Sequence, residues 1–383
     1  MNRPHRRDHN SVPIGRRVAE LRARRGMSQQ TFADRLGKSK SWVDKIERGV
    51  RRLDRYSVIR EIADVLRLDP DLLLGPRQPP PTAPSLDGVD GVRAALARYH
   101  DGPQRTVAAQ QASRQVAYSW MAYQHARYPQ LLDALPALLD ATRGTRSLLV
   151  STYRITAGVL IKLDHPHLAW LAADRAVTTA TGGPTLAATA TIAVAQALRA
   201  LGHHHLALST ALTAKDTADD PGVRGTLYLQ AGLAAAGSGD RRNTDDLLDH
   251  AAALADRHTS DSDPHHTGFG PAAVQVARFL AAHHLGDTTE ALHRHMHAIR
   301  NDGWRRLPPE HRAAHLVDAA RAYLDTGDPA QAGQALLHAD RIAPAEVRSR
   351  PAARTLLAQV IQRGPATADV ARLATIVGLT RQP

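Results

Sequence analysis

The stretch MSQQTFADRLGKSKSWVDKIERG, residues 27–49, predicts two short helices joined by a tight turn. Ser28 and Ser39 stand where a serine side chain can accept from the first free backbone N–H groups of each helix. Gly37 follows the first predicted helix and Gly49 follows the second. Glycine adopts positive φ angles without strain, so both glycines are suited to end a helix.

Further helices are predicted on both sides of this stretch. Ile14, Val18 and Leu21 lie on one face of a helix that ends at Gly26. A helix over residues 55–66 and a short one over residues 69–74 follow, which gives five helices in all. Beyond them, residues 75–91 contain five prolines and few residues to bury, as is typical of a linker. The sequence thus predicts four parts: a disordered basic arm (1–11), a five-helix domain (12–75), a Pro-rich linker (76–91) and a helical repeat domain (92–383).

The positive charge is concentrated in the first part of the chain. Residues 1–77 hold 19 Lys and Arg against 10 Asp and Glu, whereas the remaining residues hold 30 against 27. A basic domain beside a near-neutral one is typical of proteins that bind a polyanion. There are no cysteines and no apolar run of about 18 residues, so we expect a soluble, cytoplasmic protein without membrane spans.

Residues 92–383 predict an all-α domain of repeated helix pairs. Turns are predicted at Asp164, Gly202, Gly239, Gly286 and Gly327, at spacings of 38, 37, 47 and 41 residues. Small residues recur after these turns and allow paired helices to approach closely, as in an α-solenoid. An insert, HTSDSDPHHTGFG (258–270), lengthens one spacing. The alternative is a helical bundle without repeats.

Residues 313–346 resemble a tetratricopeptide repeat. Leu316, Ala320, Tyr323, Gly327, Ala332, Leu336, Ala339 and Pro344 stand at that family's large, small, aromatic, glycine, alanine and proline positions. The resemblance implies a tetratricopeptide-like solenoid with a concave groove. In that register Arg154, Gln196, Arg199 and Arg321 face the groove, where arginines could bind a peptide carboxylate, or else pair with acidic residues on the rim.

Residues 12–75 resemble the XRE-type, phage-repressor-like helix-turn-helix regulators. Ser28-Gln29 opens the first helix of the motif, Ala33 is the small residue at the helix crossing, and Ile46, Glu47 and Gly49 match the end of the recognition helix. The resemblance implies that this domain binds double-stranded DNA, with the second helix of the motif in the major groove.

The amphipathic pattern of residues 39–49 separates candidate DNA contacts. Val43 and Ile46 face inward, which leaves Lys40, Ser41 and Lys45 to contact base edges. Candidate phosphate contacts are Gln29, Lys38, Trp42, Arg48, Arg51 and Arg52. Trp42 has an alternative role, which is to cover the seam between the helices. Asp44 is expected to pair with Arg48, four residues on.

Other kinds of site have weak support. His293 and His297 share a helix face and could chelate a metal, but no third ligand is marked by its spacing, so no metal and no cofactor are predicted. No phosphate-binding loop, nucleophile elbow or carboxylate pair indicates an enzyme. The aromatic residues Tyr118, Trp120, Tyr123 and Tyr128 fall on or near one predicted helix (103–127), where they suit core packing, a subunit interface or a ligand pocket.

Together these features predict a homodimeric transcriptional regulator. It would read a palindromic operator through its helix-turn-helix domain and bind a peptide, small-molecule or protein effector through its repeat domain. The architecture is similar to that of the peptide-sensing quorum regulators. The alternative is a helical-repeat adaptor that mediates protein contacts without specific DNA recognition.

Overall fold

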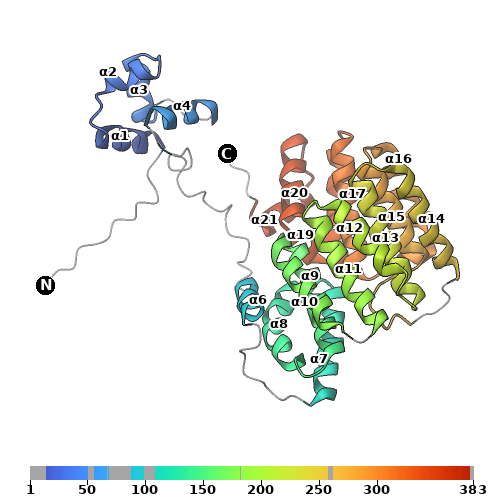
Figure 1. The fold of residues 1–383 in the computed structure, drawn as a ribbon. Coiled ribbons are helices and arrows are strands. Elements are labelled where there is room, and N and C mark those ends of the chain that lie inside the picture. Colours follow the sequence, from blue (N-terminus) through green and yellow to red (C-terminus); the bar gives the residue numbers. More distant parts are fainter. Residues whose placement is uncertain are drawn as a thin grey trace. The chain divides into compact units, whose positions relative to one another are not determined.

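A computed structural model describes residues 14–50, 56–66, 68, 88–98, 108–181, 183–257 and 262–379. Within these ranges the chain forms helices, turns and loops and contains no strand. The chain divides into two compact units, Met1–Thr82 and Ala83–Pro383, which are drawn in Figure 1. The predicted all-α fold is therefore confirmed.

Unit 1 holds four described helices: α1 (Ile14–Arg24), α2 (Gln29–Arg35), α3 (Lys40–Glu47) and α4 (Tyr56–Leu66). Ser28 caps α2 by accepting from the Thr31 N–H at 3.0 Å, and Ser39 caps α3 by accepting from the Trp42 N–H at 3.2 Å. Gly26, Gly37 and Gly49 have φ angles of 67°, 63° and 76° and follow α1, α2 and α3. Local capping and turn chemistry thus define these helices as predicted. The arm (1–11) and the fifth predicted helix (69–74) lie outside the described residues.

The core of unit 1 fixes α3 against the other helices. Phe32 and Ala33 of α2, Val43 of α3 and Val18 of α1 are almost fully buried and pack together with the inner face of α4. Trp42 is half-buried and packs against this core, so its ring covers part of the seam between the helices.

Unit 2 begins with a helix inside the predicted linker. Helix α6 (Gly88–Ala97) starts before residue 91, because Val89, Val92 and Leu96 are buried in the core of unit 2. The predicted end of the linker was therefore wrong by a few residues. Residues 76–87 lie outside the described part. The remaining helices are α7 (Ala109–Gln124), α8 (Tyr128–Thr142), α9 (Arg146–Lys162), α10 (Pro166–Thr179), α11 (Pro184–Ala200), α12 (His204–Lys215), α13 (Pro221–Gly237), α14 (Arg241–Arg257), α15 (Pro271–His284), α16 (Thr288–Arg300), η2 (Asp302–Arg306), α17 (Pro309–Asp325), α18 (Pro329–Ile342), α19 (Pro344–Arg348), α20 (Pro351–Arg363) and α21 (Ala368–Ile376).

The predicted turns join helices in pairs: α9 with α10, α11 with α12, α13 with α14, α15 with α16, and α17 with α18. Asp164, Gly202, Gly239, Gly286 and Gly327 stand at these turns with φ angles between 65° and 81°. Alanines such as Ala169, Ala207 and Ala332 are fully buried where the paired helices meet. The helix pairs lie side by side in a stack, as in tetratricopeptide-like solenoids (Figure 1).

The first and last helices of unit 2 share one hydrophobic core. This core contains Leu135 of α8 and Leu163 after α9 together with Leu316 of α17 and Val347 of α19. The two ends of the helix stack are therefore in contact, and the superhelix closes upon itself.

The aromatic residues predicted on one helix belong to two. Helix α7 spans Ala109–Gln124, Ala126 adopts a positive φ of 53°, and Tyr128 starts α8. The positive φ turn ends α7 and reverses the chain direction, so the helix predicted over 103–127 is present in its described part but ends at Gln124, and Tyr128 belongs to the next helix. Trp120 and Tyr128 are buried in the core, whereas Tyr118 is 59% exposed.

Candidate nucleic-acid interface and effector groove

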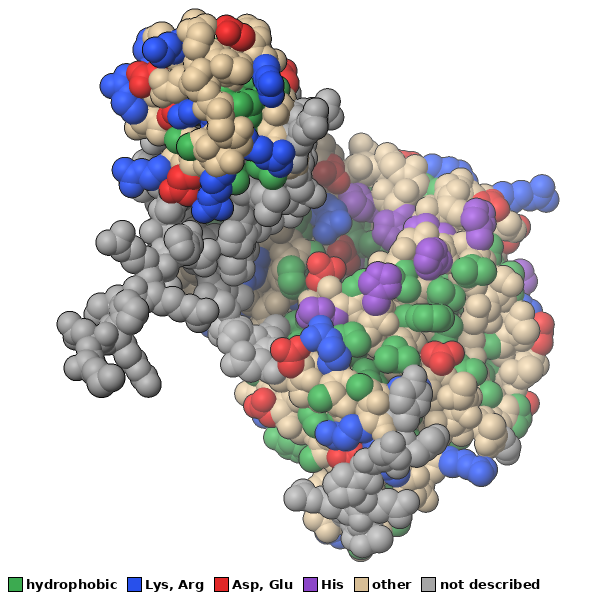
Figure 2. Space-filling model, turned by 60° about the vertical axis from the view of Figure 1, so that its left-hand side comes forward, with side chains coloured by type: hydrophobic (Ala, Val, Ile, Leu, Met, Phe, Trp, Pro, Cys, Tyr) green, Lys and Arg blue, Asp and Glu red, His purple; other side chains and the backbone are tan. Residues whose placement is uncertain are grey.

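Helix α3 presents a polar face to solvent. Val43 and Ile46 are buried, with 1% and 2% of their surfaces exposed, whereas Lys40, Ser41 and Lys45 are exposed. Ser41 and Lys45 are four residues apart and so lie on the same face of the helix, with Lys40 at its N-terminus. Basic side chains are distributed over the visible surface of unit 1 (Figure 2). The three residues predicted to contact bases are thus exposed to solvent.

Glu47 at the end of α3 joins three helices. Its carboxylate accepts from Nε and Nη2 of Arg22 on α1 at 2.6 and 3.1 Å, and from Nε2 of Gln29 on α2 at 2.8 Å. Only 7% of the Glu47 side chain is exposed, and its hydrogen bond raises the pKa of Arg22. Because α3 is held at this end, its exposed N-terminal half has a fixed orientation.

Gly15 on α1 allows a close approach to α3. A Cβ atom at this position would lie 2.0 Å from the carbonyl oxygen of Ile46. Backbone atoms cannot give way to a side chain as a flexible neighbour can, so any larger residue here displaces α1 or α3. Gly15 therefore sets the distance between these two helices, a role that the sequence analysis did not assign.

The predicted phosphate contacts differ in their availability. Lys38 is exposed in the turn between α2 and α3. Arg48 follows α3 and pairs with Asp44 at 2.5 Å, with 63% of its side chain exposed. The Gln29 amide donates to Glu47, so part of its hydrogen-bonding capacity is used within the domain. Arg51 and Arg52 lie outside the described residues.

Sequence comparison identifies unit 1. A helix-turn-helix domain family matches residues 13–74. The uncharacterized HTH-type transcriptional regulator YazB of Bacillus subtilis (strain 168) is 41% identical over 64 residues, which are 17% of this chain and 91% of that protein. The chain belongs to the helix-turn-helix transcriptional regulators, and its DNA-binding unit is unit 1.

Structural comparison extends over both units. The crystal structure of Bacillus thuringiensis PlcR in complex with the peptide PapR7 and DNA covers 87% of this chain and 98% of its own chain. The identity is 11% and the TM-score is 0.38. At this level of similarity the ligands of PlcR say nothing about those of the present chain.

The four predicted groove residues fall in two different surroundings. Arg154 is only 8% exposed, and its guanidinium donates to the carbonyl oxygen of His265 at 2.9 Å. Arg199 donates to Oε1 of Gln230 at 2.8 Å, while Arg321 is exposed and Gln196 is half-buried. The contacts described for Arg154 and Arg199 have no partner in common. Arg154 is therefore already engaged by the 258–270 insert, and Arg199 by α13.

Arg199 and Arg321 act on the same histidine. Burial, and then the positive charges of Arg199 and Arg321 among others, lower the pKa of His284 to about 4. Figure 2 shows histidine side chains gathered on one face of unit 2. His284 is therefore neutral at physiological pH.

A buried ionic cluster closes the superhelix and was not predicted. Lys162, one of only two lysines beyond residue 45, pairs with Glu310, and its Nζ lies 3.2 Å from Oε1 of Glu346. Glu346 also accepts from the Tyr128 hydroxyl and from Nη1 of Arg350, the latter at 2.5 Å. Both glutamates are at least 98% buried. The cluster joins α8 and α9 to α17 and α19, and the isolated lysine was its only signal in the sequence.

A buried histidine pair was also missed. Nδ1 of His295 lies 2.8 Å from Nε2 of His315, and both rings pack against Phe279. Burial lowers the pKa of His295 to about 4 and that of His315 to about 3, so both are neutral at pH 7. Among the described residues, no group of three His, Asp or Glu side chains is placed to hold a metal ion. The described helices also include none with the length and apolar character needed to cross a membrane.

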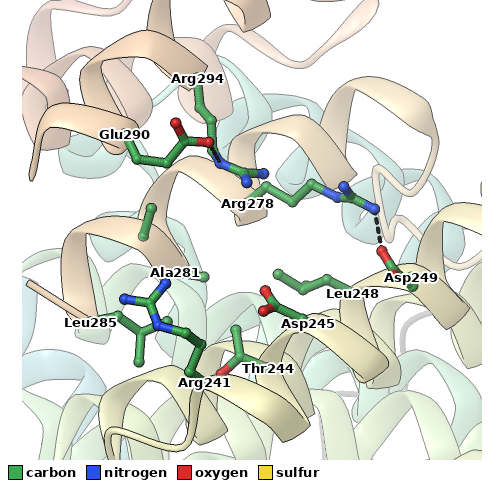
Figure 3. A pocket seen from close by; sticks show the side chains of 11 residues that line it. Arg241, Thr244, Asp245, Leu248, Asp249, Arg278, Ala281, Leu285, Glu290 and Arg294 are labelled. Carbon is green, nitrogen blue, oxygen red and sulfur yellow. Dashed lines mark hydrogen bonds and ion pairs between the residues drawn. The ribbon is translucent and has the colours of Figure 1, made fainter. Parts of the chain in front are cut away.

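A polar notch lies between α14, α15 and α16 (Figure 3). It encloses about 50 Å³, and Arg278 and Arg294 at its edge pair with Asp249 and Glu290 at 2.6 and 2.7 Å. Pockets for small organic ligands usually measure about 300–1,000 Å³. The notch is therefore too small for such an effector, and ion pairs already satisfy much of its charge.

Proposed function

We propose that unit 1 recognises a specific operator sequence by placing α3 in the major groove. The observation that carries this proposal is the combination of three exposed residues on α3, Lys40, Ser41 and Lys45, with a rigid attachment of α3 through Glu47. A lysine ammonium can donate to O6 and N7 of guanine, and a serine hydroxyl can donate or accept. A fixed helix orientation keeps these groups in register with the base edges.

The phosphate contacts of this proposal surround α3. Lys38 in the turn and Arg48 after α3 lie on either side of the base-contacting residues, and Trp42 lies beside them and is partly exposed. Arg51, Arg52 and the arm (1–11) supply further positive charge in the sequence. The side-chain amide of Gln29 donates to Glu47, so Gln29 would contact a phosphate through its backbone N–H at the start of α2.

We also propose that residues 92–383 dimerise the chain and bind an effector. In support of dimerisation, α7 exposes Tyr118 and Met121, with 59% and 55% of their surfaces accessible. Tyr118 also lines a hollow of about 460 Å³ between α7 and α8, together with small residues such as Ala134 and Ala137. Large exposed apolar side chains beside a hollow are typical of protein interfaces. A dimeric regulator would bind a palindromic operator as two half-sites, in the cytoplasm and without a cofactor or a catalytic step.

Binding to duplex DNA at several salt concentrations tests the DNA-binding part of the proposal. Lys40→Ala and Ser41→Ala should reduce the preference for an operator sequence, obtained by selection from a random DNA pool, over random DNA, because they remove base contacts. Lys38→Ala should weaken binding to both by a similar factor and lower the salt dependence by about one phosphate contact. Equal losses on both DNAs for all three variants would contradict the assignment. Absence of salt-sensitive binding would favour the adaptor function.

A further inference from the structure

Residues 262–270, between α14 and α15, form a folded segment rather than an ordinary connection. Asp263 organises the segment by accepting from the backbone N–H groups of Thr267 and Gly268 at 2.9 and 2.7 Å. His266 and Gly268 adopt positive φ angles of 51° and 62°. The segment therefore has a defined shape.

One end of the segment contacts α7 and α9. The ring of His266 stacks on Trp120 of α7, with a centroid distance of 4.7 Å and an interplanar angle of 18°. The guanidinium of Arg154 on α9 donates to the carbonyl oxygen of His265 and lies 5.1 Å from the Trp120 ring. Burial, partly offset by Asp263, lowers the pKa of Arg154 to about 10. A main-chain carbonyl and a planar ring thus fill a site made by an arginine and a tryptophan.

The other end of the segment contacts α13 and α17. The ring of Phe269 lies against the backbone of α13 at Gly225, where a Cβ atom would come within 2.0 Å of Phe269 Cζ. A Cβ atom on Gly268 would lie 2.8 Å from the imidazole of His311. Because Gly225 has no side chain, α13 leaves a space there that the ring of Phe269 fills; we call this space the Gly225 notch. Gly225 is far in sequence from Trp120 and Arg154.

Trp120 carries a second sign of a binding site. Its side chain is 5% exposed, and its indole Nε1 is buried without a hydrogen-bond partner among the described residues. A buried indole N–H usually has an acceptor. His266 thus covers the ring of Trp120, while the segment supplies no acceptor for its N–H.

We propose that Trp120, Arg154 and Gly225 form a peptide-binding site that residues 262–270 occupy within the chain. The ligand is a peptide that adopts the same turn, with a backbone carbonyl for Arg154, a planar side chain for Trp120 and an aromatic ring three positions later for the Gly225 notch. An attached segment competes at an effective concentration in the millimolar range, so a modest affinity keeps the site filled until a tighter peptide displaces the segment. The proposal deepens the effector-binding role of unit 2 and rests on it.

The test uses the peptide SDPHHTGFG, residues 262–270, labelled with a fluorophore at its N-terminus. In the full chain, residues 262–270 are replaced by a Gly-Ser segment of the same length, which vacates the site without changing the reach of the connection. Fluorescence anisotropy should show saturable binding of the peptide to this variant. Binding to the unaltered chain should be weaker by at least about tenfold, because its own segment competes.

Two controls address the notch. In the peptide, alanine in place of the residue equivalent to Phe269 should weaken binding by at least about tenfold, since the buried ring is lost. In the Gly-Ser variant, Gly225→Leu should abolish binding, because its side chain fills the notch that Phe269 has left. Helicity measured by circular dichroism establishes that each variant is folded. Should the Gly-Ser variant lose helicity, Phe269→Ala in the full chain provides the weakened segment instead.

The outcomes separate this proposal from the wider one. Absence of peptide binding to a folded variant with a vacated or weakened segment overturns it, as does binding that Gly225→Leu leaves unchanged. Operator binding by the same variants is measured in parallel. Peptide binding that leaves operator affinity unaltered would support the site and contradict its role as an effector site.

Discussion

Replacing Lys162 with methionine should destabilise unit 2 strongly at neutral pH. The ammonium of Lys162 lies between Glu310 and Glu346, whose exposed fractions are 2% and 0%. Methionine keeps much of the volume but leaves two buried carboxylates without this cation. Removing one partner of a buried ion pair typically costs about 3–5 kcal/mol. The loss should be global, because the cluster joins the first helices of unit 2 to the last.

The matched control is Lys215→Met. Lys215 is itself 20% exposed and lies over the Tyr228 ring, but its ion pair with Asp216 at 2.6 Å lies at the surface, because 74% of the Asp216 side chain is exposed. Exposed ion pairs contribute about 0–1 kcal/mol, so this variant should remain close to the unaltered chain in stability. The free energy of unfolding is measured by urea denaturation, followed by circular dichroism because helices dominate unit 2.

The destabilisation by Lys162→Met should depend on pH. Burial by itself would raise the pKa of Glu346, but Lys162 and Arg350, with hydrogen bonds from Tyr128 and Arg350, lower it. In the unaltered chain this carboxylate therefore contributes stability above its ordinary pKa, and the contribution is lost as the pH falls through the lowered value. Without Lys162, burial favours the protonated carboxyl, so the stability difference between variant and parent should be smaller at pH 5.5 than at pH 7.5. A variant as stable as its parent at pH 7.5, or an equal difference at both pH values, would refute the reasoning.

Three further predictions concern unit 1 and the histidine pair. Gly15→Ala should destabilise unit 1 by about 1–3 kcal/mol, because its Cβ would clash with the carbonyl of Ile46, and thermal unfolding followed by Trp fluorescence measures the loss. Glu47→Gln should cost about 2 kcal/mol of stability and reduce affinity for the operator more than for random DNA, because α3 loses its fixed orientation, as seen by anisotropy titrations on operator and random duplexes. Burial lowers the pKa values of His295 and His315, so the free energy of unfolding should fall below pH 6.5, by about 2 kcal/mol for each histidine at pH 5. Leucine at both positions should remove this pH dependence in urea denaturation.

Local chemistry made much of unit 1 predictable. Ser28, Ser39 and Gly37 act on backbone groups within a few residues, so their roles follow from the sequence alone. The exposure of Lys40 and Lys45 followed from the helical period once Val43 and Ile46 were assigned to the core. The helix-pair turns of unit 2 were predictable for the same reason, because a residue with positive φ ends each first helix.

Contacts between distant parts of the chain were not predictable in this way. Tyr128 and Glu346 are 218 residues apart, and they meet only because the superhelix completes a turn. The small rotation between successive helix pairs determines this closure, and no local pattern encodes it. Likewise, the insert at 258–270 was visible as an irregular spacing, but its contact with Arg154 depends on the path of the whole stack.

Selection of bound duplexes from a random DNA pool by the full chain tests whether α3 recognises a specific sequence. We expect enrichment of a palindromic sequence whose half-sites are about one helical turn apart, with binding that weakens as salt rises. Repeating the selection with Lys40→Ala should enrich sequences that show a weaker base preference within each half-site. A pool that remains random after selection, while the protein stays folded, would contradict sequence-specific recognition by α3.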